Sequence, residues 1–308
     1  MELWVAGLNA WGQLDSWEQL DNSSPPASPA EKNTKDIHTF QKCLEDDYIK
    51  VLWIGESVTL LDTSHGIMTA GFLDVIARLI IQHPQLYHSV AIAGNDKMAG
   101  AYRPFTIPVI EEEILWLFDS PPQYEHEGRR APKIRDNVSA VVANQTSFSA
   151  LCNTGELWTW GDGRFPHCLG RNVNEKSPAR IPAKPEYFNQ LPTGPIKKVC
   201  SGGYVTGALT VGHDLYVWGI HPVLDLRGDP SPVDLDGADF EDFAIGNDHV
   251  IALTTDGRLF VVGLGSNGQL GRKVDRLDDW NEVCLTLGEG QRITEVHAGY
   301  KSSFIIVE

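Results

Sequence analysis

Residues 240–271 read FEDFAIGNDHVIALTTDGRLFVVGLGSNGQLG. The stretch contains a small-residue turn at Gly246, an apolar run that ends in Ala252-Leu253, and a second apolar run that ends in Gly263. Short apolar runs that alternate with glycine-containing turns are typical of β-hairpins. A hairpin unit of this kind, repeated along a chain, indicates a repeat architecture.

The same features recur in register in two further segments. Residues 138–170 read VSAVVANQTSFSALCNTGELWTWGDGRFPHCLG, and residues 196–219 read IKKVCSGGYVTGALTVGHDLYVWG. Asn144 and Gly202 stand at the turn, and a strand of the form Leu-aromatic-x-x-Gly ends at Gly161 and Gly219.

Weaker copies lie upstream, and one copy is divided between the two ends of the chain. Residues 51–71 contain the turn residue Gly55, and the segment that begins at residue 90 contains Gly94. Residues 295–308, with Gly299, match the first half of a unit, and residues 1–15, with Gly7, match the second half. A sheet built from both ends leaves no unpaired edge between the first and last repeats.

Six turn residues therefore predict an all-β, closed β-propeller of six blades, with seven possible, over residues 1–308 as one domain. A seventh blade has room in residues 16–48 or 72–137. Residues 21–36 are rich in serine and proline and predict a flexible loop insert, and residues 123–137 predict a charged connector.

Composition limits the classes of partner. The net charge is −16 and the pI is about 5.0, which disfavours direct nucleic-acid binding and favours a basic or mixed-charge protein partner. The five cysteines include no CxxC pair and are odd in number, which indicates unpaired thiols in a reducing compartment. The residues show no signal peptide and no membrane span, so we expect an intracellular protein of the nucleus or cytoplasm.

The chain contains no motif that predicts an enzyme. GxSxG and HExxH are absent. Gly263 to Gly268 match GxGxxG, but residues 269–280 have Gly271 in what would be the first helical turn and only a thin apolar stripe. A propeller turn is therefore expected. We therefore expect no catalytic residue, no cofactor and no metal site.

Three motifs resemble the regulator of chromosome condensation repeat: LWTWG at residues 157–161, YVWG at 216–219 and GQLG at 268–271. The resemblance covers nearly the whole chain and implies a propeller. It also suggests small RCC-domain proteins, of the type that partners a JmjC oxygenase or of the Elongator-associated α-tubulin suppressor type. The founding member of the family is a guanine nucleotide exchange factor for a small GTPase.

The predicted function is thus a non-catalytic protein-interaction scaffold. It would be a monomeric propeller and a regulatory subunit of a heteromeric complex, either chromatin- or histone-modifying or of the Elongator type that modifies tRNA and translation factors. Nucleotide exchange on a small GTPase is the alternative. The predicted partner site combines loop residues that follow the Leu-aromatic-x-x-Gly strands with tryptophans outside the repeat pattern: Asn9, Trp11, Trp17, Asp162, Phe165, His221, Ser266, Asn267 and Trp280.

Overall fold

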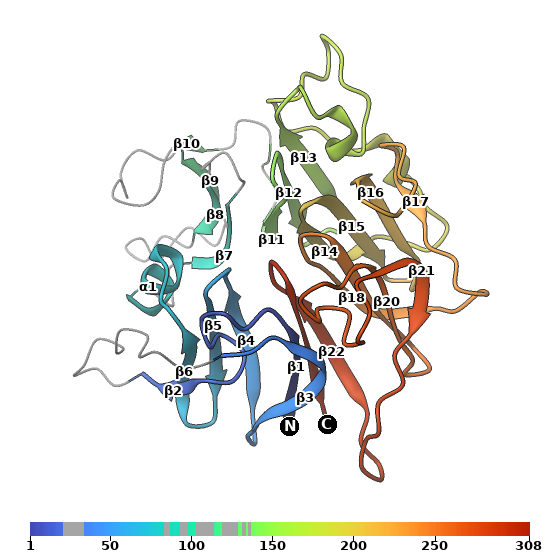
Figure 1. Cartoon of the computed structure of the whole chain (residues 1–308). Coiled ribbons are helices and arrows are strands. Elements are labelled where there is room, and N and C mark those ends of the chain that lie inside the picture. The colour runs from blue at the N-terminus through green and yellow to red at the C-terminus, as the bar shows by residue number, and fades with distance from the viewer. Residues whose placement is uncertain are drawn as a thin grey trace. The chain divides into compact units, whose positions relative to one another are not determined.

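The computed structural model describes residues 1–20, 34–82, 87–92, 98–102, 114–118, 129–130, 134 and 137–308 (Figure 1). Gly94, residues 21–33 of the predicted loop insert and most of the connector 123–137 lie outside the described residues. The chain divides into two compact units, which are described separately. Residues 1–81, 222–224 and 238–308 form unit 1, and residues 82–221 and 225–237 form unit 2.

Unit 1 contains three antiparallel sheets of four strands, named here the terminal, second and third sheets. The terminal sheet has the order β22 (Ile293–Ala298), β23 (Ser302–Val307), β1 (Glu2–Gly7) and β3 (Ile37–Glu45). The second sheet has the order β2 (Trp17–Gln19), β6 (Gly66–Gly71), β5 (Val58–Thr63) and β4 (Ile49–Ile54). The third sheet has the order β18 (Phe240–Ile245), β19 (His249–Thr254), β20 (Leu259–Leu264) and β21 (Arg276–Glu282).

Unit 2 also contains three antiparallel sheets. The first has the order β10 (Arg129–Arg130), β9 (Ile114–Phe118), β8 (Met98–Tyr102) and β7 (Tyr87–Ile92). The next contains β11 (Val138–Ala143), β12 (Ser147–Cys152) and β13 (Leu157–Gly161), and the last contains β14 (Ile196–Gly202), β15 (Tyr204–Thr210), β16 (Leu215–Ile220) and β17 (Ser231–Pro232). Two 3-10 turns, Pro166–Leu169 and Glu186–Phe188, lie in the connecting segments.

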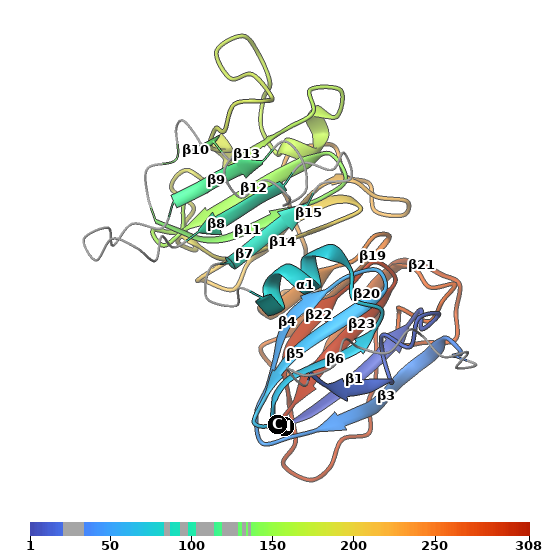
Figure 2. The same cartoon turned by 90° about the vertical axis from the view of Figure 1, so that its left-hand side faces the viewer.

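The two ends of the chain share the terminal sheet, as the divided repeat predicts. β1 pairs with β23 in antiparallel register from Glu2 opposite Val307 to Gly7 opposite Ser302. Figure 1 shows the N- and C-termini side by side at one end of this sheet, and Figure 2 shows the same end from the side. Residues 34–48 add β3 to the terminal sheet, so they do not form a further sheet in the described structure.

The fold is an all-β propeller, and its described sheets match the predicted number of blades in part. Five sheets have four strands each, whereas the sheet of β11–β13 has three. The place of a fourth strand is taken there by a single bridge between Thr159 and Ala183, closed by two backbone hydrogen bonds of 2.9 and 3.2 Å.

Neighbouring sheets within a unit pack through apolar faces. In unit 1, Ile251 and Val261 of the third sheet pack in one cluster with Ile305 of the terminal sheet. In unit 2, Leu151 of β12 packs with Trp218 of β16. The second strands β12, β19 and β23 are buried at every position, because both faces of these strands meet apolar surface. This burial explains why the repeats carry continuous apolar runs rather than alternating ones.

Glycine ends the Leu-aromatic-x-x-Gly strands because the backbone of the preceding turn lies too close for a side chain. Gly263 has a φ of +122°, and a Cβ atom there would lie 2.2 Å from the carbonyl oxygen of Asp248. The same carbonyl accepts a hydrogen bond from the Leu264 backbone at 2.8 Å. Only glycine tolerates this geometry. The same approach to a carbonyl oxygen recurs at Gly7, Gly71, Gly161 and Gly219.

The turn residues also share one backbone contact. The N–H groups of Gly55, Asn144, Gly246 and Gly299 each donate to the carbonyl of the residue three positions on, at 2.8–2.9 Å. Gly202 stands opposite Val205 in the same position, and the residue after it, Gly203, has a φ of +52°.

One helix interrupts the β pattern and was not predicted. α1 (Val75–Gln82) follows β6, and Asp74 caps its first turn by accepting the Ala77 N–H at 2.7 Å. Ala77 packs with Val58 and Leu60, so the helix covers a face of the second sheet. No helix in the described part of the chain is long and apolar enough to cross a membrane.

Candidate functional site

Every sheet except that of β7–β10 has one described edge, called here the loop edge, which carries the turn between its first two hairpin strands and the loop after its third strand. In unit 1 the loop edge comprises residues 8–16, 55–57, 72–74, 246–248, 265–275 and 299–301. In unit 2 it includes residues 144–146, 162–165, 203, 221 and 225–230. Five large exposed apolar side chains lie at or beside these edges: Trp11, Phe72, Tyr204, Ile220 and Tyr300.

A buried glutamine holds each of two equivalent loops at the loop edge of unit 1. Gln13, 3% exposed, accepts the backbone N–H of Trp11 at 2.9 Å and donates to the carbonyl oxygens of Leu8 and Glu56 at 2.9 and 3.3 Å. Gln269 likewise accepts the backbone N–H of Asn267 at 3.0 Å. The GQL motif therefore fixes the loop conformation.

The same glutamines attach their loops to the next sheet through their own carbonyl groups. Thr59 of β5 donates to the Gln13 carbonyl at 2.9 Å, and Ser303 of β23 donates to the Gln269 carbonyl at 2.7 Å. His249 is fully buried, and its Nε2 lies 2.9 Å from Ser303 Oγ. Because that hydroxyl donates to Gln269, it accepts from His249, which fixes the proton on Nε2.

Asp36, the last residue of the predicted loop insert and not a predicted site residue, links two loops of this edge. Its Oδ1 accepts the backbone N–H of Asn9 at 3.1 Å, and its Oδ2 accepts the side-chain amide of Asn267 at 2.8 Å. Asn9 is fully buried, and its side-chain oxygen accepts the Leu14 N–H at 3.0 Å. Asn9 therefore shapes the loop and does not belong to an exposed surface. Ser266 is exposed and Asn267 is partly buried.

The three tryptophans chosen outside the repeat pattern take different places. Trp11 is 48% exposed at the loop edge, as predicted. Trp17 and Trp280 were expected in loops but lie in the outer strands β2 and β21, where both are partly buried. Trp17 packs against the core cluster that contains Leu14. The prediction failed for these two because the outer strands share little sequence between repeats.

The loop edge of unit 2 carries a mixed-charge aromatic group. Arg164 binds the Asp162 carboxylate through Nε and Nη2 at 2.9 and 2.6 Å, which lowers the pKa of Asp162 to about 2. The Arg164 guanidinium lies 5.8 Å from the Phe165 ring, and that ring lies 5.7 Å from the ring of Tyr204. His221 follows β16 and is partly buried. Asp162 and Phe165 are therefore neighbours, whereas Tyr204 was missed because it belongs to a different repeat.

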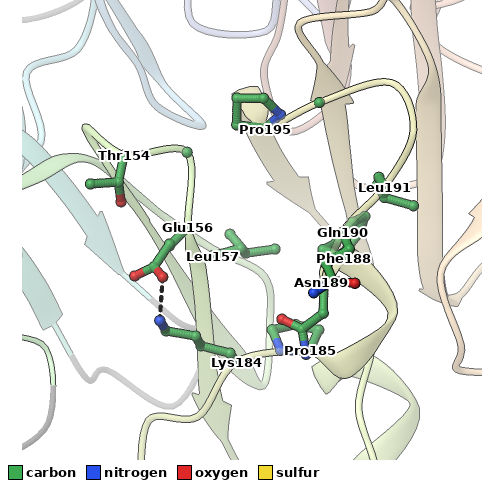
Figure 3. A pocket seen from close by; sticks show the side chains of 12 residues that line it. Thr154, Glu156, Leu157, Lys184, Pro185, Phe188, Asn189, Gln190, Leu191 and Pro195 are labelled. Carbon is green, nitrogen blue, oxygen red and sulfur yellow. Dashed lines mark ion pairs between the residues drawn. The ribbon is translucent and has the colours of Figure 1, made fainter.

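A cavity of about 360 Å³ lies in unit 2, between the β12–β13 turn and residues 184–195 (Figure 3). Leu157 and Phe188 supply apolar walls, and Glu156 and Lys184 form an ion pair of 2.5 Å beside them. The Lys184 ammonium also lies 5.0 Å from the Trp158 ring. The lining therefore contains one acid and one base that bind each other, which gives it no preference for a charged ligand.

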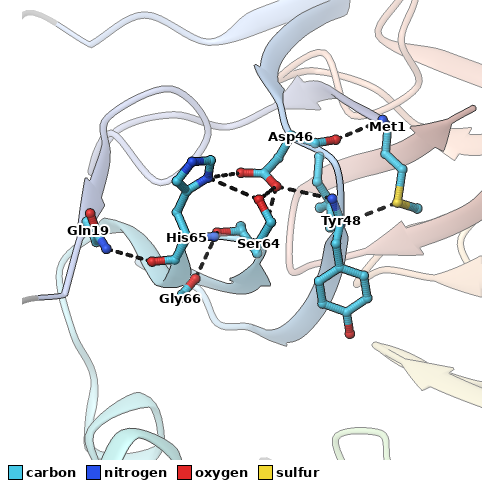
Figure 4. Close-up of polar contacts among 9 residues, drawn as sticks. Met1, Gln19, Asp46, Tyr48, Ser64, His65 and Gly66 are labelled. Atoms are coloured by element: carbon cyan, nitrogen blue, oxygen red, sulfur yellow. Dashed lines mark hydrogen bonds and ion pairs between the residues drawn. The ribbon is translucent and has the colours of Figure 1, made fainter.

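Aspartate, serine and histidine meet at the opposite edge of unit 1, but not in a catalytic order (Figure 4). His65 Nδ1 lies 2.7 Å from Asp46 Oδ2, and the Ser64 hydroxyl donates to Asp46 Oδ1. A serine nucleophile has to bond the histidine that deprotonates it through the ring nitrogen remote from the aspartate. Here serine and the Nδ1 atom both face the aspartate, so the group closes a turn. The Ser64 and His65 contacts hold the pKa of Asp46 below its usual range.

Three other features that could carry chemistry are a metal site, a reactive thiol and a dinucleotide-binding turn. The described residues contain no group of three or more His, Cys, Asp or Glu side chains placed to hold a metal ion. Burial raises the pKa of the Cys43 thiol to about 12, so it is not a reactive thiolate. Residues 265–275, after the GxGxxG match, form turns and contain no helix, so they do not form a dinucleotide-binding strand–turn–helix unit.

Comparison with known proteins agrees with the repeat pattern. Models of the regulator of chromosome condensation (RCC1) repeat match residues 240–269 and 256–306. The chain is 36% identical over 146 residues to RUG3, a mitochondrial RCC1 domain-containing protein of Arabidopsis thaliana, covering 44% of this chain and 32% of that protein. It is 30% identical over 151 residues to the mouse regulator of chromosome condensation, covering 46% of this chain and 34% of the relative.

The matched segment thus spans about a third of the length of these curated relatives. Among solved structures, Prp20p of Saccharomyces cerevisiae, described with its binding properties to Gsp1p and histones, aligns over 99% of this chain and 77% of its own. The TM-score is 0.59 at 14% identity, which supports the propeller fold. Sequence repeats, sheet order and fold agree: residues 240–306 match the RCC1 repeat, and the chain is similar to RCC1-repeat proteins.

Proposed function

We propose that the chain is a non-catalytic scaffold that binds a protein partner through the loop edges of its sheets. The observation that carries the proposal is the concentration of exposed aromatic and aliphatic side chains there, on loops held by buried hydrogen bonds. Aromatic side chains on pre-ordered backbone are favoured anchors of protein interfaces, because they bury large areas at little cost in entropy. In unit 2 the proposed contacts include Asp162, Phe165 and His221, and in unit 1 they include Ser266 and Asn267.

The net charge of −16 supports a basic or mixed-charge partner, because long-range attraction raises the rate of encounter with positive surfaces. A regulatory role in a chromatin- or Elongator-type complex of the nucleus or cytoplasm remains part of the proposal. We also propose that the sheet of β11–β13 with its Thr159–Ala183 bridge is a sixth blade, since it keeps the turn and strand register of the other sheets.

Affinity capture from the native organism tests the scaffold. The tagged chain is compared with a loop-edge variant, Tyr204→Ala with Ile220→Ala, and with Tyr48→Ser, which changes a similarly exposed side chain at the opposite edge of unit 1. The proposal expects a stoichiometric partner that the loop-edge variant loses and Tyr48→Ser keeps. Equal recovery by all three proteins, or no partner for the folded chain, would contradict it.

Nucleotide exchange on a small GTPase is a second candidate, supported by the similarity to the regulator of chromosome condensation. His249 follows the turn residue Gly246, and none of the other five predicted units has a histidine at the equivalent position. It is fully buried and bonded to Ser303, so it supports packing rather than contact with a GTPase. Release of fluorescent GDP from a small GTPase of the native organism tests this candidate. A rate equal to the intrinsic one removes it.

A further inference from the structure

Three segments at the loop edge of unit 1 meet at Gln13 and place two large aromatic side chains on one part of the surface. Residues 8–16 carry Trp11, residues 55–57 carry Glu56, and residues 71–74 carry Phe72. Gln13 bonds the backbone of the first two segments. A Cβ atom on Gly71 would lie 2.9 Å from the Cβ of Gln13, so the third segment passes directly beside it.

The backbone beneath these aromatics is fixed, while their side chains face solvent. Phe72 donates its N–H to the Ser57 carbonyl at 2.7 Å and accepts the Ser57 hydroxyl at 3.0 Å. Its side chain is nevertheless 45% exposed, and that of Trp11 is 48% exposed. The surface is therefore pre-ordered, and a ligand that covers it would not have to order the loops.

All the charged side chains of the three segments are negative. The segments contain three carboxylates, Asp15, Glu56 and Asp74, and no lysine, arginine or histidine. Asp15 and Glu56 are exposed and form no ion pair within the part of the chain that the structure describes. Asp74 is committed to the start of α1 through the Ala77 N–H. Two carboxylates thus remain on the surface beside two aromatic rings.

Among the residues that the structure describes, the nearby bases do not neutralise this surface. Lys35 is exposed beside Asp36, which carries its own carboxylate, and Lys301 lies 5.8 Å from the Tyr300 ring, in a different turn of the same edge. The corresponding edge of unit 2 differs, because Arg164 occupies Asp162 there. Carboxylates and aromatic faces without a base are the groups that bind lysine and arginine side chains, through ion pairs and cation–π contacts.

We propose that this acidic aromatic patch, made of Trp11, Asp15, Glu56 and Phe72, binds a lysine- and arginine-rich segment of a partner protein. The proposal rests on the proposed protein-binding function and names the chemistry of one contact in it. The rings would take the aliphatic stems and cationic heads of the basic side chains, and Asp15 and Glu56 would pair with their charges. Long basic side chains suit this surface because their stems are apolar and their heads are charged.

The test is a titration of the whole chain with a short synthetic peptide rich in lysine and arginine, followed by intrinsic tryptophan fluorescence and by calorimetry. An acidic peptide of the same length is the control ligand. We expect binding of the basic peptide only, weakened as ionic strength rises. Trp11→Ala should weaken it about tenfold, as loss of a cation–π and apolar anchor implies. Tyr48→Ser should leave it unchanged.

A charge-reversal variant distinguishes binding at this patch from a general attraction of the basic peptide to an acidic protein. The variant with Asp15→Lys and Glu56→Lys should lose the basic peptide and gain the acidic one, whereas Glu175→Lys with Glu186→Lys, equal in charge and exposed in unit 2 outside the loop edge, should retain the basic peptide. Equal loss in both variants, or no binding by the parent chain, would overturn the patch. A partner captured through Tyr204 and Ile220 would still leave the proposed scaffold function standing.

Discussion

At one edge of unit 1, Asp46 accepts hydrogen bonds from Ser64 and Tyr48 and faces His65, so its carboxylate serves the turn in which it lies. At the loop edge of the same unit, Gln13 and Asp36 hold the backbone, while Asp15 and Glu56 remain exposed beside Trp11 and Phe72. Both edges are rich in polar groups. At the loop edge, buried side chains bond the backbone, so the surface carboxylates and aromatic rings stay available for a partner. At the other edge, the carboxylate itself bonds the turn.

The first prediction concerns the close approach that shapes the loop edge. Gly263→Ala places a Cβ atom against the Asp248 carbonyl at a positive φ, and should lower the free energy of unfolding by more than about 2 kcal/mol. Gly257→Ala, in a turn of the opposite edge with no heavy atom within 4 Å, should cost about 1 kcal/mol from its backbone conformation alone. Urea unfolding measures both variants. Equal losses would show that the strand-end contact does not constrain the fold.

Two glutamines, one at each edge, give the next comparison. Gln13→Ala leaves the buried backbone groups around it without partners, and should lower stability by about 1–3 kcal/mol. Gln19→Ala removes an exposed bond to the His65 carbonyl, which water replaces, and should cost less than about 0.5 kcal/mol. Thermal unfolding distinguishes the two. If Gln13→Ala unfolds no more easily than Gln19→Ala, the buried glutamine does not hold the loop.

Acid should weaken the turn at Asp46. Its pKa lies below the ordinary aspartate value because Ser64 and His65 bond the carboxylate, so this contribution to stability is complete above the pKa of the unfolded chain. The contribution is lost as the pH falls toward the lower pKa of the folded protein. The stability difference between the parent and Asp46→Asn should therefore shrink between about pH 5 and about pH 2. A difference that stays constant over this range in urea unfolding would contradict the assignment.

The exposed aromatics should matter least for stability. Trp11→Ala and Tyr48→Ser each remove a side chain that is about half exposed, and should each change the free energy of unfolding by less than about 1 kcal/mol. Circular dichroism melts measure this change. A large loss for Trp11→Ala would mean that its ring supports the loop rather than contacts a partner.

Much of the fold follows from the sequence because the repeats place glycine where a side chain would meet a carbonyl oxygen, as at Gly7, Gly219 and Gly263. The shared terminal sheet was predictable because the two halves of one repeat stand at the two ends of the chain. The outer strands that contain Trp17 and Trp280 could not be placed, since they share no pattern. α1 carried a signal, Asp74 ahead of an apolar run, that the surrounding β pattern obscured.

The candidate site was predictable only in outline. Trp11 was identified as an exposed aromatic, but Phe72 and Glu56 belong to a weak repeat, and their proximity depends on the bonds of Gln13. Asn9 was misjudged as a surface residue, since its buried bond to Leu14 has no sequence signature.

Hydrogen–deuterium exchange of the chain, with and without the basic peptide, locates the binding surface without any substitution. The loop-edge assignment predicts slower exchange in residues 8–16, 55–57 and 71–74, with no change in residues 46–48 and 64–65. Protection confined to the Asp46 turn, or spread evenly over all sheets, would contradict it.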